Sequence, residues 1–230
     1  MKYKEVISLL KSMENKKNIE GMQRFGIRGG KMLGISVYDI RKIAKENGKD
    51  HSLALKLWKS GIHEARMLAC FVGEPDKLTE EQMEKWVKDF DSWDIVDQCC
   101  ANLFDRTPFV EKKINEWTKR NEEFVRRAGF VLICAKSVHD KKAKDKEFER
   151  YFPIIKKYAT DERNFVKKAV NWALRQIGKR NPALNKKAIK VAKELETSDS
   201  KSARWIAKDA LRELTSEKAQ ERLKKTLGML

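Results

Sequence analysis

Apolar residues recur along this chain at intervals of three and four, the spacing that places side chains on one face of a helix. In the first such stretch, from Tyr3 to about Glu14, Val6, Leu10 and Met13 fall on one side. Runs of alternating apolar and polar residues bounded by turn residues, which would predict strands, are absent from the sequence. The pattern therefore predicts a protein that is helical almost throughout.

Capping residues mark the starts and ends of several predicted helices. Ser36 can cap the helix that Gly48 ends, and Thr79 and Gln82 form a capping box. Ser92 is the expected N-cap of another helix. Pro108 starts the helix after that one. The helices predicted in the first half are 3–14, 36–47, 50–59, 63–72, 79–90 and 93–104.

The second half of the chain repeats itself. The sequence FVRRA at 124–128 recurs as FVKKA at 165–169, and a third variant lies at 205–212. A period near 40 residues with two helices per unit is typical of HEAT-like arrays, which stack into a curved solenoid with a concave surface. We therefore predict an all-α fold, a HEAT-like helical repeat solenoid, as a single domain over residues 1–230.

The charge of the chain is strongly positive and unevenly distributed. It carries 51 Lys and Arg against 34 Asp and Glu, a formal net charge of +17. Residues 1–110 hold 19 basic and 17 acidic side chains, and residues 111–230 hold 32 and 17. Because the basic residues are interleaved with apolar ones at helical spacing, they belong to a folded surface. We expect a basic concave groove that binds a polyanion.

Several classes of protein are disfavoured by the sequence. The cysteines form no C-x-x-C pair and are expected to be reduced, and the three histidines lack ligand spacing, so we expect no metal and no cofactor. No apolar run approaches the roughly 18 residues of a membrane-spanning helix, and the first residues do not lead into a signal-peptide core. A soluble, cytoplasmic protein is expected. The cysteines are Cys70, Cys99, Cys100 and Cys134.

A glycine-rich stretch at 21–31 invites comparison with a nucleotide-binding loop. No glycine lies five residues before Gly30, however, and Met32 stands where such a loop needs Ser or Thr for magnesium. The stretch is better interpreted as a structured loop beside a nucleic-acid backbone. The cations expected to contact that backbone are Arg24, Arg28 and Lys31.

The segment at 92–97 places Trp93 and Asp97 one turn apart on a helix. Either this is an ordinary helix start with Trp93 in the core, or Asp97 lies at the edge of a cleft where it meets a positive charge, since an unpaired buried carboxylate is costly. Trp172 and Arg175 share a helix face in the same way. The other four tryptophans are expected in the core: Trp58, Trp86, Trp117 and Trp205.

The repeated segment also carries paired cations. Arg127 is either a salt-bridged surface residue or part of a row that faces phosphates. The equivalent positions of the next unit are also basic, Lys167 and Lys168. This recurrence favours the interpretation that Arg127 belongs to a row of cations facing phosphates.

Three segments together resemble the DNA alkylation repair family, the HEAT-like alkylpurine DNA glycosylases of the AlkD type. They are SWDIVD at 92–97, FVRRAG at 124–129 and KKAVNWALR at 167–175. The segments RFGI at 24–27, LGIS at 33–36 and HEAR at 63–66 also fit. The resemblance covers nearly the whole chain, and the three motifs are specific only in combination.

The resemblance implies roles for individual residues. Asp97 would be the catalytic carboxylate, and Trp93 and Trp172 the aromatics that line the lesion site. Arg127 matches a backbone-contacting arginine of the family, and Arg175 a second basic residue beside the site.

Two positions depart from the family pattern. Phe25 falls roughly where a further aromatic residue, often Tyr, is expected, and it lacks the hydroxyl. Ser92 stands where some relatives have another Trp. These departures bear on the range of substrates more than on the type of reaction.

The implied chemistry is consistent with elementary principles. A purine alkylated at N3 or N7 is cationic, so its N-glycosidic bond is already weak and a single carboxylate can stabilise the oxocarbenium-like sugar. Each indole adds roughly 0.5 to 2 kcal/mol of cation-π attraction. We expect a monomeric, monofunctional DNA glycosylase that acts on duplex DNA with alkylated purines at the nucleoid, in the first step of base excision repair. The alternatives are a non-catalytic nucleic-acid binder and a protein-binding HEAT adaptor.

Overall fold

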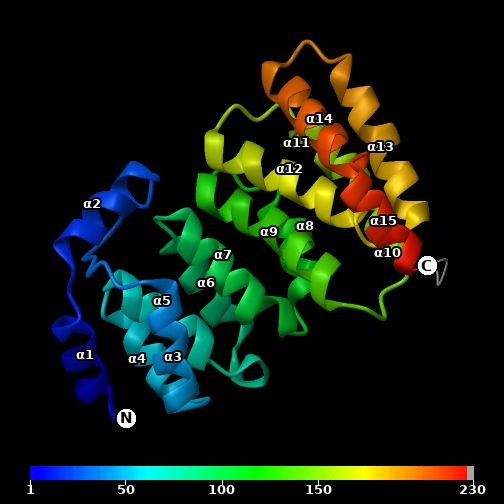
Figure 1. The fold of residues 1–230 in the computed structure, drawn as a ribbon. Coiled ribbons are helices and arrows are strands. Elements are labelled where there is room, and N and C mark those ends of the chain that lie inside the picture. The colour runs from blue at the N-terminus through cyan, green and yellow to red at the C-terminus, as the bar shows by residue number, and fades with distance from the viewer. Residues whose placement is uncertain (227–230) are drawn as a thin grey trace. The chain divides into compact units, whose positions relative to one another are not determined.

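The computed structural model describes residues 1–226, and over this range the chain is helical (Figure 1). The described residues contain no strand, only an isolated parallel bridge between Lys31 and Ile62. The prediction of an all-α fold is confirmed.

The observed helices agree with the predicted ones to within about a turn, apart from the first part of the glycine-rich stretch. Along the chain the elements are α1 (Tyr3–Ser12), α2 (Lys16–Arg24), α3 (Val37–Asn47), α4 (His51–Lys59), α5 (His63–Val72), η1 (Pro75–Lys77), α6 (Glu80–Lys88), α7 (Trp93–Asn102), η2 (Phe104–Arg106), α8 (Val110–Trp117), α9 (Glu123–His139), α10 (Asp145–Glu149), α11 (Phe152–Tyr158), α12 (Asn164–Gly178), α13 (Pro182–Glu196), α14 (Lys201–Leu214) and α15 (Glu217–Thr226).

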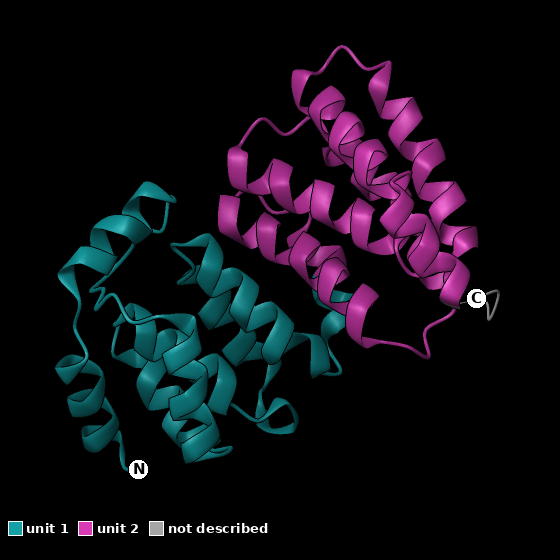
Figure 2. Ribbon diagram, in the orientation of Figure 1, with its two compact units in different colours: residues 1–113 teal, residues 114–230 magenta. Residues whose placement is uncertain are grey.

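The chain divides into two compact units, residues 1–113 and 114–230 (Figure 2). Unit 1 has 21 basic and 18 acidic residues, and unit 2 has 30 and 16, so the net charges are +3 and +14. The division of charge predicted between the two halves therefore coincides with a structural division. A single HEAT-like repeat domain over the whole chain stays a prediction.

The predicted loop at 21–31 is wrong in its first four residues, because α2 continues to Arg24. The side chain of Asn15 caps this helix by accepting a hydrogen bond from the Asn18 backbone N–H, at 3.1 Å. A good cap offsets part of the roughly 1 kcal/mol that a glycine costs inside a helix. Gly21 is therefore tolerated, and the loop begins at Phe25.

The start of α7 differs in detail from the prediction. Ser92 is the N-cap residue, but its side chain makes no capping hydrogen bond. Its hydroxyl donates instead to Oδ1 of Asp94, which also accepts a hydrogen bond from the Ile95 backbone N–H. The serine therefore orients a carboxylate of the first helical turn.

In unit 1, the carboxylate of Glu64 fixes the loop that follows α2. Glu64 lies on α5 and is fully buried. It accepts hydrogen bonds from the backbone N–H groups of Leu33 at 2.9 Å, Gly34 at 2.7 Å and Ile35 at 3.4 Å. Gly34 has a φ of 74°, and an added Cβ there would collide with the backbone oxygen of Asn15. The loop is therefore held against both α5 and the start of α2.

A buried pair joins the first turn of α5 to the first turn of α7. His63 Nε2 lies 2.9 Å from Asp94 Oδ2. Burial alone would lower the pKa of His63, but the hydrogen bond and charge of Asp94 outweigh it and the pKa is raised. Burial likewise opposes the charged form of Asp94, yet His63 and Ser92 lower its pKa. The charged forms of both partners are therefore favoured.

Unit 2 has the successive helix packing of a repeat protein. The two echoes FVRRA and FVKKA lie in the first turns of α9 and α12, and α12 packs against α9 and α14 (Figure 1). The rings of Phe124 and Phe165 lie 5.6 Å apart between centroids. Asn171 on α12 donates to Asp209 on α14 at 2.7 Å. Corresponding positions of neighbouring repeats thus contact one another, as stacked repeats require.

We expect Glu64→Gln to lower the free energy of unfolding by about 2 kcal/mol or more, because the amide presents an N–H group to backbone donors in a buried site. Urea denaturation of the full chain measures this change. The matched control is Glu81→Gln on the surface of α6, which should change the free energy by less than about 0.5 kcal/mol. Equal effects of the two substitutions would contradict the role given to Glu64.

The His63–Asp94 pair predicts a pH dependence of stability. A raised pKa means that the contribution of His63 is complete below its unfolded value of 6.5 and is lost as the pH rises through the folded pKa. The contribution of Asp94 is complete above 3.8 and is lost as the pH falls through its lowered pKa. Denaturation between about pH 6 and pH 9 should therefore show stability falling with pH, and His63→Gln should remove that trend.

The exposed His139 supplies the control for this experiment. His139→Gln should keep the slope of stability against pH. A His63→Gln protein with the wild-type slope would show that the pair does not titrate as described.

Candidate functional site

The N-terminal part of α7 carries the candidate site of unit 1. Trp93 is its first residue and Asp97 lies one turn further along, and both side chains are partly exposed. Three other tryptophans are buried as predicted: Trp58, Trp86 and Trp117 are 4%, 3% and 0% exposed. Trp93 is therefore more accessible than these three core tryptophans.

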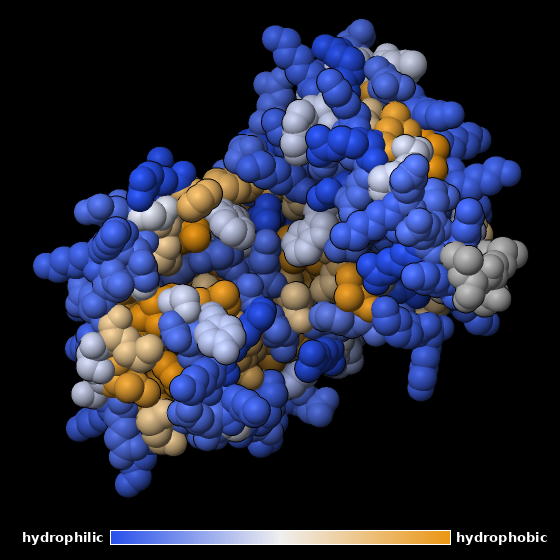
Figure 3. Space-filling model, in the orientation of Figure 1, coloured by the Kyte–Doolittle hydropathy of each residue, from blue (hydrophilic) through white to orange (hydrophobic). Residues whose placement is uncertain are grey.

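The indole of Trp93 is tied to the loop after α2. Its Nε1 donates a hydrogen bond of 3.1 Å to the backbone oxygen of Phe25. The Phe25 side chain itself is 77% exposed, a large apolar surface to leave in water. Trp93 and Phe25 line a cavity of about 710 Å³ between α2, the following loop and α7. Figure 3 shows apolar surface gathered on this unit.

The three cations predicted around this loop have exposed side chains. Lys31 is anchored through its main chain, because its carbonyl oxygen accepts a hydrogen bond of 2.9 Å from the backbone N–H of His63. The backbone position of Lys31 is therefore fixed, and its side chain extends into solvent. Contact of these cations with a nucleic acid stays a prediction for Arg24, Arg28 and Lys31.

In unit 2, Trp172 lies on α12 and is also partly exposed. Arg175, three residues on, is engaged in ion pairs with α14. Its Nη1 lies 2.6 Å from Glu213 Oε2 and 3.5 Å from Asp209 Oδ2. Burial would raise the pKa of Glu213, but Lys179 and Arg175 outweigh it and lower the pKa. Part of the charge of Arg175 is thus neutralised within the protein.

The row of basic residues predicted on α9 and α12 is not uniform. Arg127 is only 5% exposed, and its Nη1 donates to the backbone oxygen of Phe165 at 2.7 Å, so it joins α9 to α12. Lys168 is exposed, and Lys167 is partly covered, with its Nζ 5.0 Å from the ring centroid of Trp205. Contact of these three residues with phosphates stays a prediction, and Lys168 is the most accessible of them.

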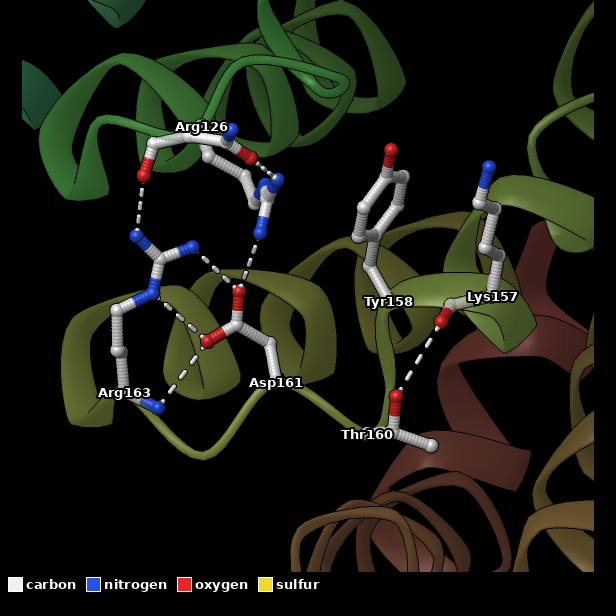
Figure 4. A pocket seen from close by; sticks show the side chains of 7 residues that line it. Arg126, Lys157, Tyr158, Thr160, Asp161 and Arg163 are labelled. Carbon is white, nitrogen blue, oxygen red and sulfur yellow. Dashed lines mark hydrogen bonds and ion pairs between the residues drawn. The ribbon is translucent and has the colours of Figure 1, made fainter.

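A polar pocket of about 490 Å³ in unit 2 was not anticipated from the sequence (Figure 4). Asp161, after α11, accepts from Arg126 Nη1 at 2.8 Å and from Arg163 Nε at 2.9 Å. Arg163 Nη1 also donates to the backbone oxygen of Asn121 at 2.5 Å. Burial alone would raise the pKa of Asp161, but hydrogen bonds from Arg163 and Arg126 lower it to about 2. The arginines are engaged with Asp161, so the cluster joins α9 to the α11–α12 connection.

The described residues 1–226 hold no cluster of three or more His, Cys, Asp or Glu side chains suited to a metal ion. Over the same range, no helix is both long and apolar enough to cross a bilayer.

Trp93 and Phe25 line one cavity of unit 1, and Asp97 lies one turn from Trp93 on α7 but is not among the residues that line it. Arg24, Arg28 and Lys31 also belong to unit 1. The remaining predicted residues lie on α9 and α12 of unit 2. A carboxylate one turn from an indole suits a positively charged or electron-poor group, because both partners attract positive charge. The face of unit 2 seen in Figure 3 is mostly hydrophilic, in line with the net charge of +14 of this unit. Such a surface is suited to a polyanion.

Comparisons with known proteins agree with these features. The model of the DNA alkylation repair enzyme family matches residues 6–214. An uncharacterized protein of Listeria innocua, Lin0241, is 23% identical over 190 residues, covering 81% of this chain and 83% of that protein.

A solved structure described as a new family of proteins related to the HEAT-like repeat DNA glycosylases, with affinity for branched DNA structures, is similar with a TM-score of 0.79 and 18% identity. The match covers 97% of this chain and 96% of that one. The fold is thus the HEAT-like repeat fold of the proteins related to those glycosylases. With the family model matching almost from end to end, the chain belongs to the DNA alkylation repair enzyme family.

Proposed function

We propose that this protein is a monofunctional DNA glycosylase that removes cationic N3- and N7-alkylated purines from duplex DNA. The observation that carries the proposal is the pair of partly exposed side chains, Trp93 and Asp97, one turn apart on α7. Membership of the DNA alkylation repair enzyme family makes an alkylated base the natural substrate class.

The proposed reaction requires the protein mainly to stabilise positive charge by electrostatic interactions. An N3- or N7-alkylpurine carries a positive charge, so it leaves as a neutral base without a strong general acid. As the N-glycosidic bond lengthens, positive charge develops on the deoxyribose. The carboxylate of Asp97 stabilises this charge and positions the attacking water.

Trp93 suits this task because its position is fixed. The hydrogen bond from Nε1 to Phe25 holds the indole, and a preorganised aromatic face stabilises a developing cation without having to reorient. Phe25 offers a second, exposed aromatic surface beside it. The resemblance assigns Trp172 of unit 2 a similar role, and this assignment belongs to the proposal.

The cations of the two units supply affinity for the DNA backbone. In unit 1 these are exposed side chains at the end of α2 and in the loop that follows it, and in unit 2 they lie on α9 and α12. Each phosphate contact releases counterions, so binding should weaken steeply with salt. The residues proposed to bind DNA are Arg24, Arg28, Lys31, Phe25, Arg127, Lys167, Lys168 and Arg175. We propose that the protein acts as a monomer in the cytoplasm, at the nucleoid.

The alternative is a non-catalytic DNA-binding protein on the same fold. It is favoured by one observation, the affinity for branched DNA attributed to the structurally similar family. Base release separates the two hypotheses, because a binding protein would hold methylated duplex DNA and release nothing.

We expect Asp97→Asn to slow the release of methylated purine from duplex DNA by about 100-fold or more, since the amide cannot stabilise the developing positive charge. Chromatography of the free bases measures the rate, and gel shift should show binding of undamaged duplex that is no weaker than in the wild type. The matched control is Asp76→Asn in η1, an exposed aspartate that should leave the rate unchanged. Release at the wild-type rate by the Asp97 variant would refute the catalytic assignment.

Lys168→Gln should weaken binding to duplexes of any sequence and reduce the slope of log affinity against log salt by about 0.9, the value for one phosphate contact. Fluorescence anisotropy over a salt series measures the slope. Lys11→Gln on the exposed side of α1 is the control, with the slope expected to stay unchanged. A loss of affinity for damaged DNA alone would argue against a phosphate contact by Lys168.

A further inference from the structure

The exposed face of α14 has an unusual composition. Its exposed positions recur at helical spacing and are basic at every place but one, where a tryptophan stands. Both acidic side chains of the helix contact α12: Asp209 accepts from Asn171 at 2.7 Å and Glu213 pairs with Arg175 at 2.6 Å. Asp209 also pairs with Arg212 of α14 itself. We call this face the α14 face. It consists of Lys201, Arg204, Trp205, Lys208 and Arg212.

Trp205 was predicted to be buried, and the structure places it 40% exposed. The core side of α14 is already filled by small and branched residues, among them Ala203, Ile206 and Ala210, which are fully buried. The indole is therefore not required to complete the core. A large aromatic side chain exposed on a helix surrounded by cations points to a ligand that presents flat rings.

The neighbouring helix adds to the same surface. Lys167 of α12 places its Nζ 5.0 Å from the Trp205 ring centroid, a cation-π contact, and Lys168 beside it is exposed. This contact holds the ring in place but leaves two-fifths of the side chain accessible. The surface thus combines an exposed aromatic ring with cations on two helices. Arg204 and Lys208 flank Trp205 on α14, and Lys167 and Lys168 lie on α12.

We propose that Trp205 is a stacking platform for an unpaired base of single-stranded DNA, and that the cations of the α14 face and of α12 bind the phosphates on either side of that base. Interleaved cations and aromatic rings are the arrangement that binds single strands, because every base has a flat face and every nucleotide a phosphate. In a duplex the bases are stacked within the helix and cannot reach an indole on the protein surface. The platform therefore distinguishes single-stranded from double-stranded DNA.

Trp205 and the cations of α14 are not among the residues proposed for base release or for duplex binding, whereas Lys167 and Lys168 of α12 are shared with the surface proposed to bind DNA. This site goes beyond base release, since it would direct the protein to DNA that contains unpaired segments. A negatively charged protein segment is the rival ligand for a basic surface, but it offers no reason for an exposed indole among the cations.

The test compares two substitutions of the same residue in the full chain. Trp205→Leu keeps an apolar side chain but removes the aromatic face, and Trp205→Phe keeps an aromatic face. Fluorescence anisotropy would measure the affinity of each protein for a labelled single-stranded oligonucleotide and for a blunt duplex of the same length. Tyr38→Ala, which removes a 77% exposed aromatic residue of unit 1, is the matched control.

We expect Trp205→Leu to lower affinity for the single strand by about 5- to 100-fold, the range found for one stacked base. Trp205→Phe should stay within about 3-fold of the wild type, because a smaller ring still stacks. Tyr38→Ala should change neither affinity, and the duplex affinity of the Trp205 variants should change by less than about 2-fold. Equal losses for the two DNA forms, equal losses for the Leu and Phe variants, or the same loss for Tyr38→Ala would overturn the proposal.

A measurement on the unsubstituted protein guards against a folding defect in the variants. With 5-fluorotryptophan incorporated, the fluorine signal that is missing from Trp205→Phe identifies Trp205. This signal should shift on addition of the single strand and not of the duplex. A signal that stays in place with both, or moves only with an acidic peptide, would refute the platform. Because neither readout depends on base release, this proposal and the glycosylase activity can fail independently.

Discussion

The buried carboxylate of Glu64 is the contact on which the arrangement of unit 1 depends. A charge at zero exposure is costly unless its oxygens are satisfied, and here three consecutive backbone N–H groups, from Leu33 to Ile35, satisfy them. The requirement acts in both directions. The carboxylate needs the loop in this conformation, and the loop, with a left-handed glycine at its centre, needs the carboxylate to accept its donors. The chain that leads from α2 to α3 is therefore fixed to α5 without a strand or a disulfide.

A second buried group, His63, connects α5 to the helix that carries the candidate site. His63 precedes Glu64 and pairs with Asp94 in the first turn of α7, so neighbouring residues of α5 hold the loop and the helix that carries Trp93. Two carboxylates of α7 then have different tasks. Asp94 is buried and committed to His63 and Ser92, whereas Asp97 is partly exposed one turn after Trp93. The buried carboxylate fixes the start of the helix, and the partly exposed one is the carboxylate proposed to act in catalysis.

The sequence predicted the helices well because their signals are local. The capping box at Thr79 and the glycine at 48 act within one turn, and the structure has them as expected. The recurrence of FVRRA as FVKKA indicated the repeats correctly, and the equivalent residues Phe124 and Phe165 contact each other in the structure. Non-local contacts were not predictable: HEAR at 63–66 was noted only as part of a resemblance, and nothing near Glu64 in sequence announces its partners some 30 residues away. Neighbouring helices likewise determine that Arg127 is buried and that Trp205 is exposed. They also determine which arginines pair with Asp161.

The contacts between repeats of unit 2 bear on how a unit of net charge +14 remains folded. Mutual repulsion of cations opposes compaction. Ion pairs offset part of it, both exposed ones such as Arg120–Glu122 and less exposed ones between helices. Asp161, Asp209 and Glu213 lie where successive repeats meet, and there they pair with Arg126, Asn171 and Arg175. These three acidic groups thus join neighbouring repeats, whereas other acidic residues of unit 2, such as Glu116, Glu162 and Glu196, are exposed. The pairs between helices therefore stabilise the stack, while the excess of basic over acidic residues leaves the unit strongly positive.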